Sequence, residues 1–264
     1  MAGRPVTLIT GASTGIGAEF ARIFSARGHE LLLVARSALH LNALADEIAA
    51  AGLKRPHILV LDLLRADATT RIEHELRERG LEAQYVVNNA GFGLFGDAAA
   101  LDRPAQLAMV DLNVRALTDL SLRFVDSLVR NRGGILNVAS VAGFVPGPGM
   151  AVYHATKAYV LSFSEALHYE LAPRGVRVTV LCPGPVPTEF QARAGIPSGN
   201  YPSMLTRSAA SVARAGYKGL MRGRRLVIPG FENKMVTLFL RLLPRRVALE
   251  LVGFRGRRAA KRIT

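Results

Sequence analysis

Near its start the chain reads Val6-Thr-Leu-Ile-Thr-Gly11-Ala-Ser-Thr-Gly15-Ile-Gly17, followed by the amphipathic segment Ala18–Arg27. The apolar run predicts a strand and the amphipathic segment a helix. Glycine permits positive φ and a close backbone approach to a phosphate, and a helix N-terminus offers unpaired N–H groups. The order strand, glycine turn, helix therefore predicts a phosphate-binding turn. An ordinary tight turn is the alternative, because G-x-x-x-G-x-G departs from the general G-x-G-x-x-G.

Apolar runs and amphipathic segments continue to alternate along the chain. Further strands are predicted at Leu31–Val34, His57–Leu61, Tyr85–Asn88, Ile135–Ala139, Val176–Leu181 and Arg225–Ile228. Helices are predicted at Ser37–Ala51, Ala66–Arg79, Pro104–Arg130 and Tyr153–Leu171. Such alternation is typical of parallel sheets with right-handed crossovers. We predict an α/β, single-domain Rossmann fold, a doubly wound parallel sheet of about seven strands with helices on both faces.

Length and composition set the domain organisation. The chain has 264 residues, 50% of them hydrophobic, which suits one large domain. We assign residues 1–230 to this dinucleotide-binding and catalytic domain, and 231–264 to a basic, partly apolar C-terminal extension. Cys182 is the only cysteine and the six histidines are scattered, so we predict no disulfide framework and no metal site. Without a signal peptide or a membrane-spanning run, a cytoplasmic protein is expected.

The formal net charge is +14, with the excess concentrated beyond residue 221. In the extension, two apolar stretches (235–240 and 247–252) are flanked by arginines. Such a segment could lie on an anionic membrane surface, cover a substrate pocket or pack between subunits. No recognisable nucleic-acid-binding module is present, so specific nucleic-acid binding is not expected.

The end of the second predicted strand bears on the choice of cofactor. An acidic residue about 20 positions beyond the glycine loop favours NAD, because it binds the ribose hydroxyls. Here the strand ends in Arg36, which could grip a 2′-phosphate bidentately or lie solvated at the start of a helix. We therefore favour NADP(H), with NAD(H) as the alternative.

Tyr153 and Lys157 lie four residues apart in a predicted helix, on one face and one turn from each other. A tyrosine hydroxyl ordinarily titrates near pH 10, and a nearby ammonium favours the phenolate. The pair therefore suits general acid–base catalysis near neutral pH. Ser140, at the end of a neighbouring strand, is placed to hydrogen-bond a reacting oxygen.

In combination these motifs resemble the classical short-chain dehydrogenase/reductase family from about Val6 to Ile228. The motifs are Thr10-Gly11-Ala-Ser-Thr-Gly15-Ile-Gly17, Asp62, Asn88-Asn89-Ala90-Gly91, Asn113, Ser140, Tyr153-x-x-x-Lys157 and Pro183-Gly184. The family's own loop is G-x-x-x-G-x-G, as here. Thr14 stands where some NADP-preferring members carry a second basic residue.

The resemblance implies a role for each matching residue. Tyr153 is the general acid or base, Lys157 lowers its pKa and holds the nicotinamide ribose, and Ser140 orients the substrate carbonyl. Asn113 holds a water of the proton relay. Cofactor contacts are implied for Gly11, Ser13, Thr14, Gly15, Ile16, Gly17, Arg36, Asp62, Leu63, Asn89, Ala90, Gly91, Tyr153, Lys157, Pro183, Gly184, Val186 and Thr188. A homodimer or homotetramer is also implied.

The family places its substrate lid after the sixth strand, here at about residues 185–207. Its apolar residues are Phe190, Ile196, Tyr201, Pro202, Met204 and Leu205. The segment 141–146 is expected to form the opposite wall. Neither segment offers an obvious charged anchor, so we expect an apolar carbonyl or alcohol substrate. A non-catalytic cofactor-sensing protein and a membrane-surface scaffold are the competing functions.

Overall fold

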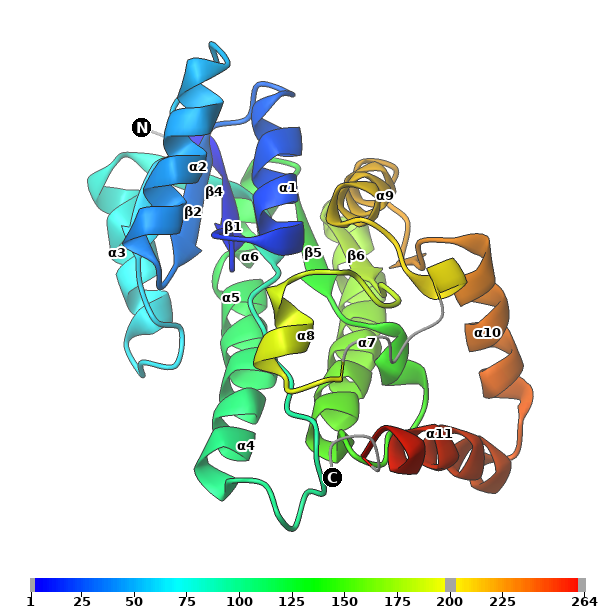
Figure 1. The fold of residues 1–264 in the computed structure, drawn as a ribbon. Coiled ribbons are helices and arrows are strands. Elements are labelled where there is room, and N and C mark those ends of the chain that lie inside the picture. Colours follow the sequence, from blue (N-terminus) through cyan, green and yellow to red (C-terminus); the bar gives the residue numbers. More distant parts are fainter. Residues whose placement is uncertain (1–2, 198–202, 261–264) are drawn as a thin grey trace.

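A single parallel sheet of seven strands organises the chain, in the order β3-β2-β1-β4-β5-β6-β7 (Figure 1). The computed structural model describes residues 3–197 and 203–260, and the side chains of those residues up to 253. The strands are β1 (Arg4–Thr10), β2 (Leu31–Ala35), β3 (His57–Val60), β4 (Leu81–Asn88), β5 (Gly134–Val138), β6 (Arg177–Leu181) and β7 (Leu226–Val227). The first six follow the Rossmann order, which confirms the predicted fold class.

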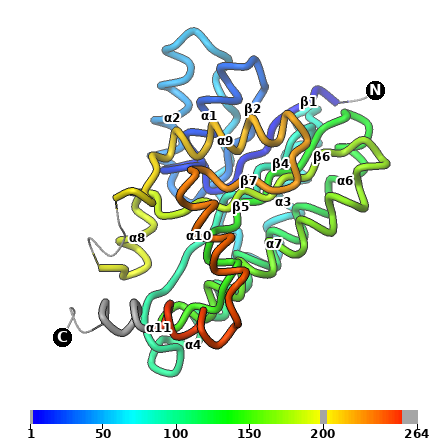
Figure 2. Tube along the Cα trace, turned by 90° about the vertical axis from the view of Figure 1, so that its right-hand side faces the viewer, coloured from blue at the N-terminus to red at the C-terminus, as the bar shows by residue number. Residues whose placement is uncertain are grey.

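Helices cover both faces of the sheet. On one face lie α1 (Gly15–Ser25), α2 (Ala38–Ala50) and α9 (Ala209–Met221). On the other lie α3 (Ala68–Glu78), α5 (Leu117–Arg123), α6 (Val125–Arg130) and α7 (Ala151–Leu171). The helix α4 (Arg103–Val110) packs beside α7. Figure 2 shows these two layers with the sheet between them. Side chains alternate along β2. Leu31 and Leu33 pack against the face covered by α1, α2 and α9, and Leu32 and Val34 pack against the opposite face. A continuous apolar run therefore fits a strand buried on both faces.

The predicted single helix Pro104–Arg130 is wrong in one respect, because the segment is interrupted twice. A π-helical segment, Asp111–Ala116, separates α4 from α5, and Phe124 leaves helical geometry between α5 and α6 (φ −101°, ψ 8°). Isolated π-helical turns inside helices are frequent at functional sites. Apolar periodicity does not reveal them, since the side chains on both sides of the turn still face the core.

The C-terminal segment continues directly from β7 as α10 (Phe231–Leu242) and α11 (Arg245–Ala260). Asn233 on α10 is buried, and its Nδ2 donates to the carbonyl oxygens of Leu205 (3.1 Å) and Pro229 (3.0 Å). A Cβ at Gly184 would lie 2.4 Å from the Oδ1 of Asn233, so α10 begins in tight contact with the loop after β6. Together with the short α8 (Glu189–Arg193), these helices lie beyond the carboxyl ends of the strands (Figure 1).

Gly133, immediately before β5, is a test of the packing within the sheet. A Cβ there would lie 1.7 Å from the carbonyl oxygen of Gln84, a backbone atom that cannot rotate away. We expect Gly133→Ala to cost about 3 kcal/mol of unfolding free energy, measured by urea denaturation. Gly52→Ala is the control: its Cβ meets open space and only its positive φ (+76°) is strained, at about 1 kcal/mol. Equal costs for the two variants would contradict this packing.

Candidate active site

A cleft of about 1530 Å³ opens at the carboxyl ends of the strands, where α/β sheets bind their ligands. This exceeds the roughly 300–1,000 Å³ of common ligand pockets, so a dinucleotide and a substrate have room together. Of the predicted site residues, those that line it are Gly11, Ser13, Thr14, Gly15, Ile16, Arg36, Asp62, Leu63, Asn89, Ala90, Gly91, Ser140, Tyr153, Lys157, Pro183, Gly184, Val186 and Thr188. Gly17 and Asn113 do not line it.

The glycine loop joins β1 to α1 with two left-handed residues, Gly11 (φ +62°) and Gly15 (φ +58°). α1 begins at Gly15, and the side chain of its N-cap residue, Thr14, makes no capping hydrogen bond. The first N–H groups of α1 thus lie at the cleft and are not capped by the side chain of Thr14. A Cβ at Gly17 would lie 2.2 Å from the carbonyl oxygen of Gly11, so Gly17 is needed for packing of the loop rather than for cleft contact. The loop fits a pyrophosphate group.

The glycine loop and Arg36 belong to the half of the cleft that suits a cofactor. Arg36 follows β2 and is exposed. Ser37 beside it caps α2, its Oγ accepting from the His40 N–H (3.3 Å). Asp62 follows β3, and its Oδ1 accepts from the N–H of Leu64 (3.0 Å). Arg36 and Asp62 both line the cleft. A cation and a carboxylate at this end fit the adenosine part of a dinucleotide, while glycines leave room for the pyrophosphate.

Lys157 lies under the centre of the cleft and is only 5% exposed. Its Nζ donates to the carbonyl oxygen of Val138 at the end of β5 (2.8 Å). Burial lowers the pKa of Lys157 from 10.5 to about 8, because an ammonium loses its hydration there. Burial also keeps the neighbouring Cys182 thiol neutral by raising its pKa. Lys157 is therefore an ammonium at neutral pH that gives up its proton at moderately alkaline pH.

Tyr153 and Ser140 face the same space as Lys157. The ring centroid of Tyr153 lies 5.8 Å from the Nζ of Lys157, as expected for residues one helical turn apart. The Oγ of Ser140 accepts from the N–H of Ala142 (3.1 Å), which orients this hydroxyl two residues after β5. The Ser, Tyr and Lys predicted from the sequence as one set thus lie together in the cleft.

Asn113 lies behind the cleft and is fully buried in the π-helical segment. Its Nδ2 donates to the carbonyl oxygen of Phe92 (2.9 Å) and to the Oγ1 of Thr156 (3.1 Å), and its Oδ1 accepts from the Phe92 N–H (3.1 Å). A Cβ at Gly91 would lie 2.8 Å from that Oδ1 and 3.5 Å from the Nζ of Lys157. Asn113 thus holds the loop after β4 against α7, a positioning contact that the sequence motif did not reveal.

The other half of the cleft is mostly apolar, although the ion pair of Glu189 and Arg193 on α8 also lines the cleft. Phe190, Ile196, Met204 and Leu205 of the predicted lid line it, whereas Tyr201 and Pro202 lie outside the described residues. The ring of Phe190 packs on that of Tyr153, with centroids 5.5 Å apart. Of the predicted opposite wall 141–146, Val141, Ala142 and Val145 line the cleft. Phe92, Phe95 and Met150 also line the cleft and were not predicted from the sequence. The only indication in the sequence is that they lie close to the motifs around Gly91 and Tyr153.

Residues of α10 and α11 also line this half, among them Met235, Phe239 and Leu251. Their location agrees with one of the three predicted roles of the C-terminal segment, a cover over the substrate pocket. Within the described ranges, no group of three or more histidine, cysteine or carboxylate side chains could hold a metal ion.

Comparison with known proteins agrees with this geometry. Residues 5–196 match the family model for short chain dehydrogenases. The chain belongs to the short-chain dehydrogenase family. It is 37% identical to sulfoacetaldehyde reductase 2 of Chromohalobacter salexigens over 188 residues, which cover 70% of this chain and 74% of the relative. As a member of this family it is an oxidoreductase that acts on an alcohol or carbonyl group with NAD(H) or NADP(H).

Two solved structures of dehydrogenases share the fold. One is a short-chain dehydrogenase from Sphingobium yanoikuyae in complex with NADPH: TM-score 0.79, 35% identity, covering 89% of this chain and 92% of that one. The other is the bulky-bulky ketone specific alcohol dehydrogenase of Comamonas testosteroni: TM-score 0.75, 28% identity, covering 93% and 97%.

The buried charge of Lys157 predicts a stability effect with a defined pH dependence. At pH 7 Lys157 is charged in both the folded and the unfolded protein. Its pKa is lowered to about 8 on folding, so burial of the charge costs about 3 kcal/mol of folding free energy. Lys157→Met removes that charge and one hydrogen bond, so we expect a net gain of about 2 kcal/mol at pH 7. Above the lowered pKa the folded wild type sheds its proton, and the gain disappears towards pH 10.5.

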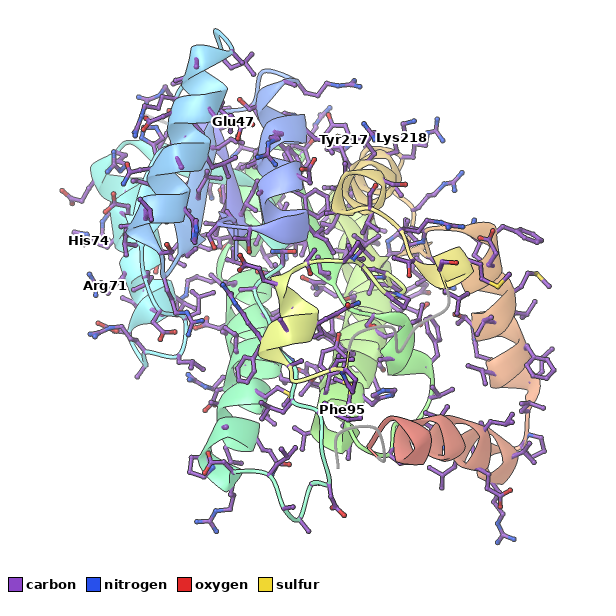
Figure 3. All side chains as sticks on the ribbon, viewed as in Figure 1. Glu47, Arg71, His74, Phe95, Tyr217 and Lys218 are labelled. Atoms are coloured by element: carbon purple, nitrogen blue, oxygen red, sulfur yellow. The ribbon has the colours of Figure 1, made fainter. Side chains whose placement is uncertain are left out.

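Thermal or urea unfolding at pH 7 and at alkaline pH measures this difference. Lys218→Met is the matched control, because Lys218 is exposed on the outer side of α9 (Figure 3). If the difference in unfolding free energy between wild type and Lys157→Met is the same at both pH values, the ammonium of Lys157 is not buried in the folded protein.

Proposed function

We propose that the protein is an NADP(H)-dependent oxidoreductase that interconverts an apolar carbonyl compound and its alcohol, with Tyr153 as general acid–base. The observation that carries this proposal is that Ser140, Tyr153 and Lys157 line one cleft together with the glycine loop. A bound nicotinamide supplies the hydride for reduction or accepts it in oxidation. The residues of the chain perform the proton transfer and the orientation of the substrate.

In the direction of reduction, Ser140 donates a hydrogen bond to the carbonyl oxygen and Tyr153 donates its hydroxyl proton to the same oxygen. The ammonium of Lys157 stabilises the phenolate that this transfer leaves behind. In oxidation the phenolate accepts the alcohol proton. Asn113 acts indirectly, since its hydrogen bonds to Phe92 and Thr156 hold the loop after β4 against α7. The relay water implied for Asn113 is part of this proposal.

The preference for NADP(H) over NAD(H) is supported by Arg36. β2 ends without a carboxylate, and Arg36 lines the cleft where the adenosine ribose would lie. The related structure from Sphingobium yanoikuyae holds NADPH, in agreement with this choice.

The apolar lining supports a substrate with a large hydrophobic part. Phe92, Phe95, Met150, Phe190 and Ile196 surround the space in front of Tyr153. The relative from Comamonas testosteroni is described as specific for bulky-bulky ketones, which agrees with a roomy, apolar site.

We further propose a homodimer or homotetramer in the cytoplasm. Several large apolar residues on α4, α5 and α7 are exposed in the single chain, namely Leu107, Val110, Leu122, Tyr159 and Tyr169. Association of subunits through these helices would bury such side chains. A cofactor-sensing protein without turnover is disfavoured, since the set of Ser140, Tyr153 and Lys157 is complete.

Tyr153→Phe tests the assigned chemistry. The variant keeps the ring that packs on Phe190 and loses the proton donor, so we expect carbonyl reduction to fall by a factor of about 10²–10⁴. NADPH oxidation measures it, with a substrate from a screen of aldehydes, ketones, quinones and steroid carbonyls. Tyr217→Phe is the control, because Tyr217 lies on α9, where its ring packs on that of Phe24 (centroids 4.9 Å apart), and it does not line the cleft. Unchanged turnover by Tyr153→Phe would refute the mechanism.

Arg36→Ala tests the cofactor assignment. A charge-assisted contact with a 2′-phosphate contributes about 1.5–3 kcal/mol, so NADPH binding should weaken about tenfold or more while NADH binding changes little. Fluorescence titration with both dinucleotides provides the measurement. Arg71→Ala is the control, since Arg71 points outward from α3, away from the cleft (Figure 3). Tighter binding of NADH than of NADPH by the wild type would overturn the NADP(H) assignment.

A further inference from the structure

One face of α10 presents large apolar side chains to solvent. Phe231, Leu238 and Leu242 are 73%, 51% and 77% exposed, and Met235 between them is 47% exposed. Their spacing places the four on one face of the helix. The opposite side of α10 carries the buried Thr237, whose Oγ1 donates to the carbonyl oxygen of Asn233. We call these four residues the α10 stripe. Apolar surface gathered in this way marks an interaction site.

The α10 stripe is continuous with the wall of the cleft. Phe231 and Met235 belong to both, and Phe239, one turn beyond Met235 on α10, is 59% exposed while also lining the cleft. On α11, Leu251 is likewise exposed and lines the cleft. An apolar molecule at the α10 stripe therefore has an apolar path to the space in front of Tyr153.

Positive charge accompanies this surface. Among residues 231–253, whose side chains the structure describes, there are four cations, Lys234, Arg241, Arg245 and Arg246, and two glutamates. By sequence alone, residues 231–264 contribute +7 to the chain's net charge of +14. One of the two glutamates, Glu232, is paired with Arg207. Lys234 and Arg241 lie along α10 beside the stripe, and both are exposed. A second copy of the chain would bring like charges together here, whereas an anionic lipid surface complements them.

We propose that the α10 stripe and its flanking cations bind the surface of an anionic lipid membrane, and that the apolar substrate enters the cleft directly from the lipid. No helix in the described part of the chain is long and apolar enough to cross a bilayer, so the contact is peripheral. Membrane binding by this surface does not require turnover, while the entry route rests on the proposed function.

Flotation with lipid vesicles tests the surface. We expect the wild type to bind phosphatidylcholine vesicles that contain phosphatidylserine, more weakly those without it, and to be released by high salt. The double variant Leu238→Ser/Leu242→Ser should bind at least about tenfold more weakly, because it loses two apolar side chains that would enter the lipid. Leu238 and Leu242 do not line the cleft. Leu39→Ser, exposed by 77% on α2, is the matched control and should bind like the wild type.

Two results would overturn the proposal: no binding of wild type to anionic vesicles, or equal binding by the double variant and the control. A double variant that instead shifts from dimer to monomer in size-exclusion chromatography, with no vesicle binding by the wild type, would make the α10 stripe an interface between copies.

Turnover separates this proposal from the proposed function. A short water-soluble ketone should be reduced equally by wild type and double variant, while a long-chain alkyl ketone embedded in anionic vesicles should be reduced at least about fivefold more slowly by the double variant. Failure of both ketones with the wild type contradicts the proposed substrate class and leaves the vesicle-binding result standing. Equal rates with the embedded ketone would refute the entry route.

Discussion

The hydrogen bond from the Nζ of Lys157 to the carbonyl oxygen of Val138 fixes the centre of this protein. It joins α7 to the carboxyl end of β5, in a position where the ammonium is almost wholly buried. Tyr153 lies one turn earlier on α7 and Ser140 two residues beyond Val138, so one bond places all three side chains together. The cost of burying the ammonium appears as its lowered pKa.

The surroundings of Lys157 make that arrangement rigid. Gly91 passes so close to Lys157 and Asn113 that a side chain there would collide with the Oδ1 of Asn113. Asn113 in turn bonds both backbone groups of Phe92 and the hydroxyl of Thr156 on α7. β4, the π-helical segment and α7 are thereby held around one point. The π-helical segment interrupts the regular α-helical hydrogen bonding, and it contains Asn113, whose side-chain amide is buried.

Much of this could be predicted from the sequence, because the features concerned are local. Apolar runs such as Leu31–Val34 predicted the strands, and the motifs around Gly11 and Tyr153 indicated the family and the cleft. The interruption of Pro104–Arg130 was not predictable, since the apolar periodicity continues across it. The roles of Met235 and Phe239 depend on where α10 lies in the fold. The helical pattern alone is compatible with a pocket cover, a subunit interface or a membrane-binding surface. Long-range contacts of Asn113 and Asn233 likewise have no local signal.

The arrangement of the active site requires Lys157 to be a buried ammonium with a lowered pKa, and NMR titration of its side chain measures this directly. The chain contains only five lysines, so labelling of lysine side-chain carbons gives few resonances, and Lys157→Met identifies the one that matters. We expect this resonance to titrate near pH 8, well below the ordinary value near 10.5. Titration of all five lysines near 10.5 would show instead that Lys157 is not a buried ammonium.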